Sequence, residues 1–438
     1  MDDQHYDFAT FPYPSPPNIL KDDITPTDQA IYVPSVSPNY ATSVYAQNWK
    51  RALPKGVNSG DLNFLDQSNG LFKISHVMSS AGQALNQKRD CIITKRDRSK
   101  TVMIGDSGGY QIAHNKLAIK DDSDRLKILH WLETHANVAM TLDIPTGPLL
   151  KGGYFYSSFE DCLDTTFYNL KYFDRKRSAE NVWFLNVLAG NDQVQSDAWY
   201  DKVKTISFEG WAFGGILRHN FYLLCRRILI MFNEEQIQDK KWIHVLGTNV
   251  LETAVLLTAL QRSINRHINP NLRISYDTSS PFRNLGWGNV YGLPNFNQKS
   301  MVMPMHKVLS STKFFDCGVR WPWKSPLGDH MTMGDVCIAE ALNRKSYLDV
   351  QSNIYLAHHN LAALCFAVAE ANRAFDASNL SHSYSIAKSA GEAVKAIDEI
   401  MRTKDFEVLE RHRPLFEKLW RGKTSPKADD EERDLSKC

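Results

Sequence analysis

Six short apolar runs in the middle of the chain each end in aspartate or glycine. Each run is rich in β-branched, aromatic or other large apolar residues, as buried strands are. The runs are TVMIGD ending at Asp106, NVAMTLD at Asp143, WFLNVLAG at Gly190, WAFGG at Gly215, WIHVLG at Gly247 and LRISYD at Asp277. Segments with helical apolar spacing separate them, such as residues 123–136 and 249–264. The alternation predicts strand–helix units and therefore a parallel sheet.

Successive run ends lie roughly 25 to 47 residues apart, which suits one strand, one helix and two loops per unit. We predict an α/β fold, a (β/α)8 TIM barrel, because polar residues recur at the strand ends and these ends form the active-site face of such a barrel. An open, doubly wound sheet is the alternative, although no G-x-G-x-x-G follows the first run.

The chain divides into four predicted regions. Residues 1–60 begin rich in Pro, Asp and Ser and predict an irregular N-terminal arm. Residues 61–375 hold the catalytic barrel, with insertions. Helical apolar spacing over residues 376–424 predicts C-terminal helices, and the charged segment 425–438 predicts a disordered tail.

Composition restricts the function only weakly. An apolar fraction of 43% is ordinary for a protein with a buried core, and the net charge of +2 gives no global signal for a polyanion partner. Any nucleic-acid binding must therefore come from local patches. No apolar run reaches the length of a membrane span. The seven scattered cysteines and an acidic, proline-rich N-terminus predict a reducing, cytosolic setting; nothing specifies an oligomeric state.

Three of the runs end in a carboxylate, at Asp106, Asp143 and Asp277. In a barrel all three point to one mouth; the alternative is that each caps the helix that follows. Tyr110 follows Asp106 closely and is placed to stack on a flat ligand. The glycines that would let the backbone approach such a ligand are Gly108, Gly109, Gly190, Gly214, Gly215 and Gly247.

The segment DSGGYQ, Asp106 to Gln111, resembles the signature of the guanine transglycosylases, which exchange guanine for a 7-deazaguanine base in nucleic acid. Further similar segments follow in the family's order over about residues 100–365: LDIPT at 142–146, VLAG at 187–190, FGGI at 213–216, HVLG at 244–247 and YDTSSPFR at 276–283. The resemblance implies a TIM barrel with pentosyltransferase activity and no organic cofactor.

The resemblance also implies a role for each matching residue. Asp277 would be the nucleophile on the anomeric carbon, Asp106 the acid/base at the purine, and Asp143 the acceptor for the base's amino and ring N–H edge. Tyr110 and Leu246 would sandwich the ring. The other residues implied to contact the base or the nucleic-acid backbone are Ser107, Gly108, Gly109, Gln111, Gly190, Gly214, Gly215, Ile216, Gly247 and Arg283.

A structural zinc ion is a further implication of the resemblance. The tRNA-modifying members carry a C-x-C-x2-C run and a distant His, and this chain lacks that run. The candidate ligands, within a possible zinc subdomain at 313–360, are Cys317, His330, Cys337 and His359. The alternative is that the cysteines are small buried hydrophobes and the histidines lie on a helix face.

Departures from the family pattern favour DNA as the polymer. Ala189 replaces the Gln of the family's V-Q-G segment, and Asn220 stands where bacterial members keep a Glu that helps to accept an aminomethyl side chain. The second replacement favours a nitrile-bearing base. Because the chain also lacks the cysteine run of the tRNA-modifying members and carries long inserts, it is most similar to the divergent DNA guanine transglycosylases of phages and bacterial DNA-modification clusters. We expect exchange of guanine in DNA for 7-cyano-7-deazaguanine through a covalent Asp–sugar intermediate.

Three other functions remain as alternatives. One is a divergent tRNA-guanine transglycosylase of the queuosine or archaeosine type. Another is a catalytically inactive barrel that only binds nucleic acid, against which the three aspartates argue. The last is an unrelated TIM-barrel glycosidase, against which DSGGYQ and the Asp–Pro–Arg spacing at 277–283 argue.

Overall fold

The computed structural model describes residues 28–84, 90–178, 182–248, 251–308, 314, 317–337, 348–381 and 386–421. The first 27 residues of the predicted arm and the predicted tail, 425–438, lie outside the described residues.

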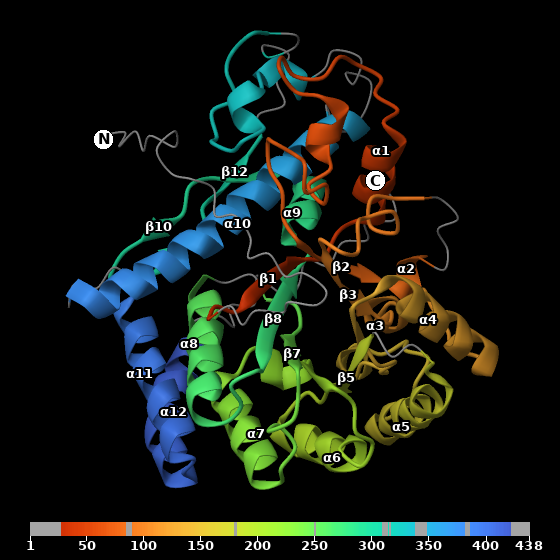
Figure 1. Cartoon of the computed structure of the whole chain (residues 1–438), viewed down its shortest axis with the longest axis vertical. Coiled ribbons are helices and arrows are strands. Elements are labelled where there is room, and N and C mark those ends of the chain that lie inside the picture. The colour runs from red at the N-terminus through yellow and green to blue at the C-terminus, as the bar shows by residue number, and fades with distance from the viewer. Residues whose placement is uncertain are drawn as a thin grey trace.

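Eight parallel strands form a nearly closed barrel (Figure 1), in the order β1-β8-β7-β6-β5-β4-β3-β2. The strands are β1 (Ile31–Pro34), β2 (His76–Ser80), β3 (Val102–Asp106), β4 (Val138–Met140), β5 (Trp183–Leu188), β6 (Gly210–Phe213), β7 (Trp242–Val245) and β8 (Arg273–Thr278). A bridge between Ser35 and Met78 joins the two end strands. The predicted (β/α)8 barrel is confirmed.

The six apolar runs are strands β3 to β8, and two strands were not predicted. The sequence analysis assigned residues 1–60 to an irregular arm, but this segment holds β1 and the helix α1 (Pro38–Ala46). The expectation was wrong because IYVP is only four residues long and is flanked by proline-rich sequence, yet its backbone from Ile31 to Pro34 pairs with residues 275–278 of β8. Pro34 ends the strand, and Ser37 then caps α1 by accepting from the Tyr40 N–H.

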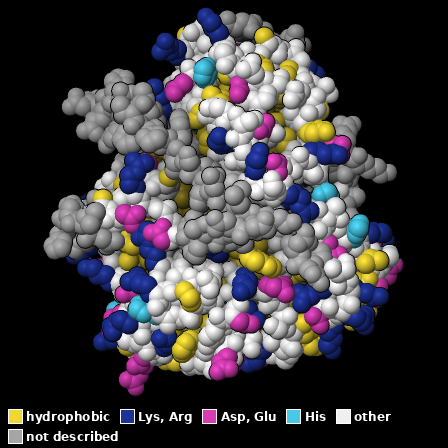
Figure 2. All heavy atoms as spheres, viewed as in Figure 1, with side chains coloured by type: hydrophobic (Ala, Val, Ile, Leu, Met, Phe, Trp, Pro, Cys, Tyr) yellow, Lys and Arg dark blue, Asp and Glu magenta, His cyan; other side chains and the backbone are white. Residues whose placement is uncertain are grey.

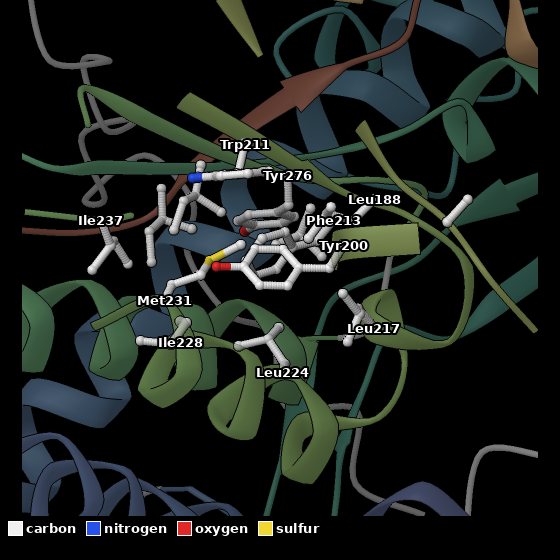
Figure 3. Packing of buried hydrophobic residues seen from close by; sticks show 14 of the residues in the cluster. Leu188, Tyr200, Trp211, Phe213, Leu217, Leu224, Ile228, Met231, Ile237 and Tyr276 are labelled. Carbon is white, nitrogen blue, oxygen red and sulfur yellow. The ribbon is translucent and has the colours of Figure 1, made fainter. Parts of the chain in front are cut away.

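Helices alternate with the strands around the outside of the barrel. They are α2 (Ala81–Ala84), α3 (Gly109–Ala113), α4 (Asp122–His135), α5 (Phe159–Lys176), α6 (Gln193–Val203), α7 (Phe221–Asn233), α8 (Leu251–His267) and α9 (Ser280–Arg283). Figure 3 shows how α7 packs: Leu224, Ile228 and Met231 lie one helical turn apart and meet Tyr200 and the barrel strands.

Alternate residues of the strands fill the barrel interior. The interior cluster contains Ile31 and Val33 of β1, Ile104 of β3, Val187 of β5 and Trp242 of β7, among others. The same alternation carries the last inward position of several strands to the carboxyl end of the barrel, where the loops meet.

A second lobe stands beside that end of the barrel. It is built from the segment between β1 and β2 and from the segment after β8, which lie together at one end of the molecule although more than 200 residues separate them (Figure 1). Its short elements are β9 (Asn289–Tyr291), β10 (Asn295–Phe296), β11 (Met301–Val302) and β12 (Met305–Lys307), with single 3-10 turns. Both segments follow the carboxyl ends of strands, so the lobe borders the mouth.

Three long helices complete the chain: α10 (Val350–Ser381), α11 (Lys388–Thr403) and α12 (Phe406–Arg421). The helix α10 contributes to the core of the lobe, whereas α11 and α12 bury apolar residues in the cluster that surrounds the barrel. Within the described ranges, no helix combines the length and apolar character that crossing a membrane requires.

Gly210, the first residue of β6, gives a test of the barrel packing. A Cβ at this position would lie 2.0 Å from the Trp242 carbonyl oxygen and 2.7 Å from a Leu185 methyl carbon. We expect Gly210→Ala to lower the free energy of unfolding by about 1–3 kcal/mol, because the neighbouring strands must move. Gly70→Ala is the control, since nothing lies within 4 Å of its Cβ. Equal urea midpoints for the two variants would contradict the described packing.

Candidate active site

Carboxylates from three strands meet at the mouth of the barrel. Asp106 is the last residue of β3, Asp143 follows β4, and Asp277 is near the end of β8. The negative charge of Asp277 acts on Asp106, and that of Asp106 acts on Asp143, so the three groups form one electrostatic unit. The sequence analysis predicted this grouping. None of the three is the N-cap residue of a helix in the structure.

Asp277 is held more firmly than a solvent-exposed carboxylate would be. Its side chain is 9% exposed, the Gly247 N–H donates to its Oδ1 over 2.7 Å, and His244 Nε2 lies 3.3 Å from the same oxygen. The Asp277 carbonyl oxygen accepts from the Thr248 N–H. Main-chain and side-chain contacts together therefore orient this carboxylate.

Burial sets the protonation of the other two carboxyls. Burial raises the pKa of Asp106, although hydrogen bonds from Ser80 and the Gly108 N–H oppose that shift. Burial, with a contribution from the charge of Asp106, raises the pKa of Asp143 to about 7. Neither pKa is lowered by a nearby Lys or Arg. The mouth thus combines an oriented carboxylate with two groups suited to gaining and losing protons.

The DSGGYQ segment is fixed to the barrel by its polar side chains. Ser107 donates to the Thr141 carbonyl oxygen over 3.1 Å, and Gln111 accepts from Ser80 over 3.0 Å. Gly108 adopts a φ of +116° at the N-cap of α3. Gly109 lies so close to Asp143 that a Cβ would sit 3.3 Å from Asp143 Oδ1.

Tyr110 is the most exposed residue of this segment, with 47% of its surface accessible. Its ring centroid is 4.0 Å from that of His114, with which it makes a tilted contact. Leu246, the other predicted sandwich residue, follows β7 and is partly buried against the barrel interior. One face of the mouth thus carries an accessible aromatic ring, as the sequence analysis required.

The glycines after β5 and β6 allow two loops to come into contact. Gly190 and Gly215 have φ values of +113° and +52°. A Cβ on Gly215 would lie 2.2 Å from the Gly190 carbonyl oxygen, so the two loops touch through their backbones. The N–H groups of Gly214 and Ile216 donate to Leu188 and Gly190. The Gly215 N–H, at the start of the 3-10 turn Gly215–Arg218, has no acceptor within that turn.

Arg283 ends the short helix α9, six residues after Asp277, and its side chain is partly exposed. Its N–H donates to the Ser279 carbonyl oxygen, and its guanidinium makes no ion pair with a described residue. Gly247 is itself exposed, and a Cβ there would lie 2.8 Å from the Arg218 guanidinium. Arg218 therefore lies beside Gly247, whose N–H donates to Asp277.

The four proposed zinc ligands do not fit a zinc ion in the described structure. Burial lowers the pKa of His359 to about 4, and both its ring nitrogens bond to protein oxygens, Ser325 Oγ at 2.8 Å and the Tyr291 carbonyl at 2.9 Å. His330 Nδ1 lies 3.1 Å from the Lys55 carbonyl oxygen. Across the described ranges, no three His, Cys, Asp or Glu side chains are grouped as a metal site.

Cys337 and Cys317 pack in the lobe instead. Cys337 is fully buried in its hydrophobic cluster, and Cys317 contacts the same cluster from its edge. This placement matches the alternative reading of these cysteines as small hydrophobes. His359 joins α10 to the lobe through its two hydrogen bonds, which is a structural role without metal.

His244 is the site residue that the sequence analysis missed. It lies two residues after Trp242 and two before Leu246, so the period of a strand puts it on the inner face of β7, toward Asp277. That alternation within WIHVLG was the signal that could have found it. Ser80, which bonds both Asp106 and Gln111, ends a strand that the sequence analysis did not predict.

No family model matches the chain, and a search of curated proteins also returned no match.

The raised pKa of Asp143 predicts how stability changes with pH. In the folded protein this carboxyl keeps its proton up to about pH 7, whereas its ordinary pKa is 3.8. Folding therefore binds a proton between these values, and wild-type stability falls as the pH rises through this window. Asp143→Asn removes this titratable group. The melting temperature of the variant should therefore rise relative to that of the wild type when the pH is raised from 5 to 8.

Thermal unfolding at both pH values tests the expectation, with Asp239→Asn as the control because 74% of the Asp239 side chain is exposed. If the difference between Asp143→Asn and wild type were the same at both pH values, Asp143 would not hold its proton as described.

Proposed function

We propose that this chain is a guanine transglycosylase that exchanges guanine in DNA for a 7-deazaguanine base, 7-cyano-7-deazaguanine. The observation that carries the proposal is the meeting of Asp106, Asp143 and Asp277 at the mouth, where Asp277 accepts from the Gly247 N–H while burial raises the pKa of Asp106 and Asp143. The reaction needs one carboxylate for the sugar and proton-exchanging groups for the base, and this division matches their environments.

The first half of the reaction breaks the bond between guanine N9 and the sugar. Asp277 attacks the anomeric carbon as the bond to N9 breaks, which gives a glycosyl ester. The departing purine carries negative charge and takes a proton from a neighbouring acid. Asp106 suits this step, because burial raises its pKa and favours the protonated form before the reaction.

The second half reverses the first with a new base. The incoming 7-deazaguanine loses its N9 proton to Asp106 and attacks the same carbon, and Asp277 leaves as a carboxylate. Two inversions give net retention, and no external oxidant, reductant or energy source is needed. Asp143 receives the amino and ring N–H edge of the base, and the Tyr110 ring stacks on its face.

An inactive binding protein is less consistent with this mouth. Asp143 and Asp106 are held against the cost of burying carboxyl groups, and no Lys or Arg lowers their pKa. Arrangements that cost stability in this way are typical of active sites. A protein that only bound a polyanion would gain nothing from three acidic groups at the centre of its binding surface.

We propose DNA as the polymer because of the residues that fill the lobe. The segment where the tRNA-modifying members carry their cysteine run is packed here around Cys337 and Trp321, both buried. Trp321 is therefore a core residue. Its neighbour Trp323 is partly exposed and stacked on His306, and of these two tryptophans it is the one suited to stack on an opened strand. On the face shown in Figure 2, Lys and Arg are interspersed with Asp and Glu, so DNA contacts would be local to the mouth.

Asp277→Ala should abolish base exchange, because it removes the proposed nucleophile. Exchange of labelled guanine into nucleic acid should fall by more than roughly 1,000-fold. The covalent protein–nucleic acid adduct, detected after denaturation, should also disappear. Asp239→Ala is the control at an exposed aspartate. An Asp277→Ala protein that keeps its fold and exchanges guanine at the wild-type rate would refute the assigned nucleophile.

The choice of polymer is tested by offering the purified chain three substrates. Duplex DNA, single-stranded DNA and tRNA are each incubated with labelled 7-cyano-7-deazaguanine, and incorporation is followed by nucleoside mass spectrometry. We expect label in DNA, with single strands favoured because flipping a base from a duplex costs a few kcal/mol. Label in tRNA alone would replace DNA by tRNA as the substrate and leave the chemistry of the site unchanged.

A further inference from the structure

A continuous chain of hydrogen bonds runs beneath the predicted nucleophile. The Trp242 Nε1–H donates to Ser275 Oγ over 2.6 Å, Ser275 Oγ lies 2.7 Å from His244 Nδ1, and His244 Nε2 lies 3.3 Å from Asp277 Oδ1. Trp242 and His244 lie on β7, and Ser275 and Asp277 on β8, where His244 and Ser275 are directly paired. All four side chains are buried.

For a neutral imidazole, the donors and acceptors of this chain favour one arrangement of protons. The indole N–H of Trp242 only donates, so Ser275 Oγ accepts from it. Among the described residues, the Ser275 hydroxyl has no acceptor other than His244 Nδ1. The hydroxyl therefore donates to Nδ1, which carries no proton. The remaining imidazole proton is on Nε2, directed at Asp277 Oδ1.

We propose that His244 is a positioning residue that acts as a neutral Nε2–H donor and selects which oxygen of Asp277 reacts. This inference rests on the proposed function. Oδ1 receives two donors, the Gly247 N–H and His244 Nε2–H, whereas Oδ2 receives none from the described residues. Oδ2 is therefore the oxygen that attacks the anomeric carbon, and Oδ1 stays fixed as the pivot of the carboxylate.

The same two donors act in both halves of the exchange. When Oδ2 bonds to the sugar, Oδ1 becomes the carbonyl oxygen of the ester and keeps both hydrogen bonds. When the incoming base attacks, the Oδ2–carbon bond breaks, its electron pair returns to the carboxylate, and Oδ1 again shares the negative charge. The donors stabilise this leaving carboxylate without giving up a proton.

Ser275 and Trp242 matter because they exclude the other tautomer. With its proton on Nδ1, His244 would point the unprotonated Nε2 at Asp277 Oδ1, and two acceptors would face each other. The hydroxyl of Ser275, itself fixed by Trp242, makes this arrangement unfavourable. A buried network in which every member is paired has one geometry, and this geometry also fixes the position of the reacting oxygen.

The tautomer is tested first, independently of any activity. Ring-nitrogen NMR of protein labelled with 15N-histidine is recorded for wild type, Ser275→Ala and His244→Gln, the last to assign the His244 signals. We expect Nε2–H and an unprotonated, hydrogen-bonded Nδ1 in the wild type, and a loss of that preference in Ser275→Ala. A protonated Nδ1 in the wild type would overturn the proposal.

Base exchange is then measured for His244→Phe, which keeps a ring but no donor, and for His244→Gln, which returns an N–H near the Nε2 position. His244→Phe should lower kcat by roughly 10- to 100-fold through misplacement of the carboxylate, with KM for the free base nearly unchanged. His244→Gln should recover most of the loss. His76→Phe is the control, since His76 is also buried but lies at the opposite end of β2 from Ser80.

Each kinetic outcome decides between a positioning role and a structural one. If His244 were merely structural, both variants would have a lower melting temperature, and His244→Gln would restore no activity. Either this combination of results or a wild-type kcat in His244→Phe would overturn the proposal. Absence of exchange by the wild type on every nucleic acid would refute the proposed function instead. The nitrogen spectrum would still decide whether His244 is a neutral donor to Asp277.

Discussion

A parallel barrel delivers the carboxyl end of every strand to one mouth, and the site in this chain depends on that constraint. Asp277 reaches its position because β8 is paired on both sides, with Val33 of β1 opposite Asp277 itself and Val245 of β7 opposite Tyr276. One residue of slippage on either side would turn Asp277 out of the barrel and an apolar tyrosine ring inward. The register of three strands thus sets which side chain of β8 faces the mouth.

The electrostatics of the mouth follow from the same geometry. Converging strand ends bring Asp106 and Asp143 close enough for their charges to interact, and the enclosing protein removes the water that would separate them. Protonation of Asp106 and Asp143, rather than a nearby Lys or Arg, reduces this repulsion. Asp277 accepts hydrogen bonds from the Gly247 N–H and from His244, and these donors stabilise its negative charge. A ligand that supplied N–H donors to Asp143 would favour its ionised form, so binding of such a ligand would be coupled to proton release.

The sequence predicted the central six strands well because each is a compact apolar run that ends at a turn. It predicted neither β1 nor β2, since IYVP and HVMSS are short and end in proline or serine without a glycine or aspartate. The lobe was also beyond local pattern analysis, because its core joins residues such as Tyr40 and Phe282, whose rings lie 5.4 Å apart although they are far apart in the chain. His244 was missed because its partner Ser275 lies on another strand.

The zinc candidates and the glycines show how one motif position can serve different physical needs. His359 was predicted as a distant zinc ligand, yet its nitrogens join α10 to the lobe through Ser325 and Tyr291. Likewise Gly190 and Gly215 are required by backbone contact between two loops, whatever the ligand. Close packing of the scaffold therefore accounts for these residues before any ligand is considered.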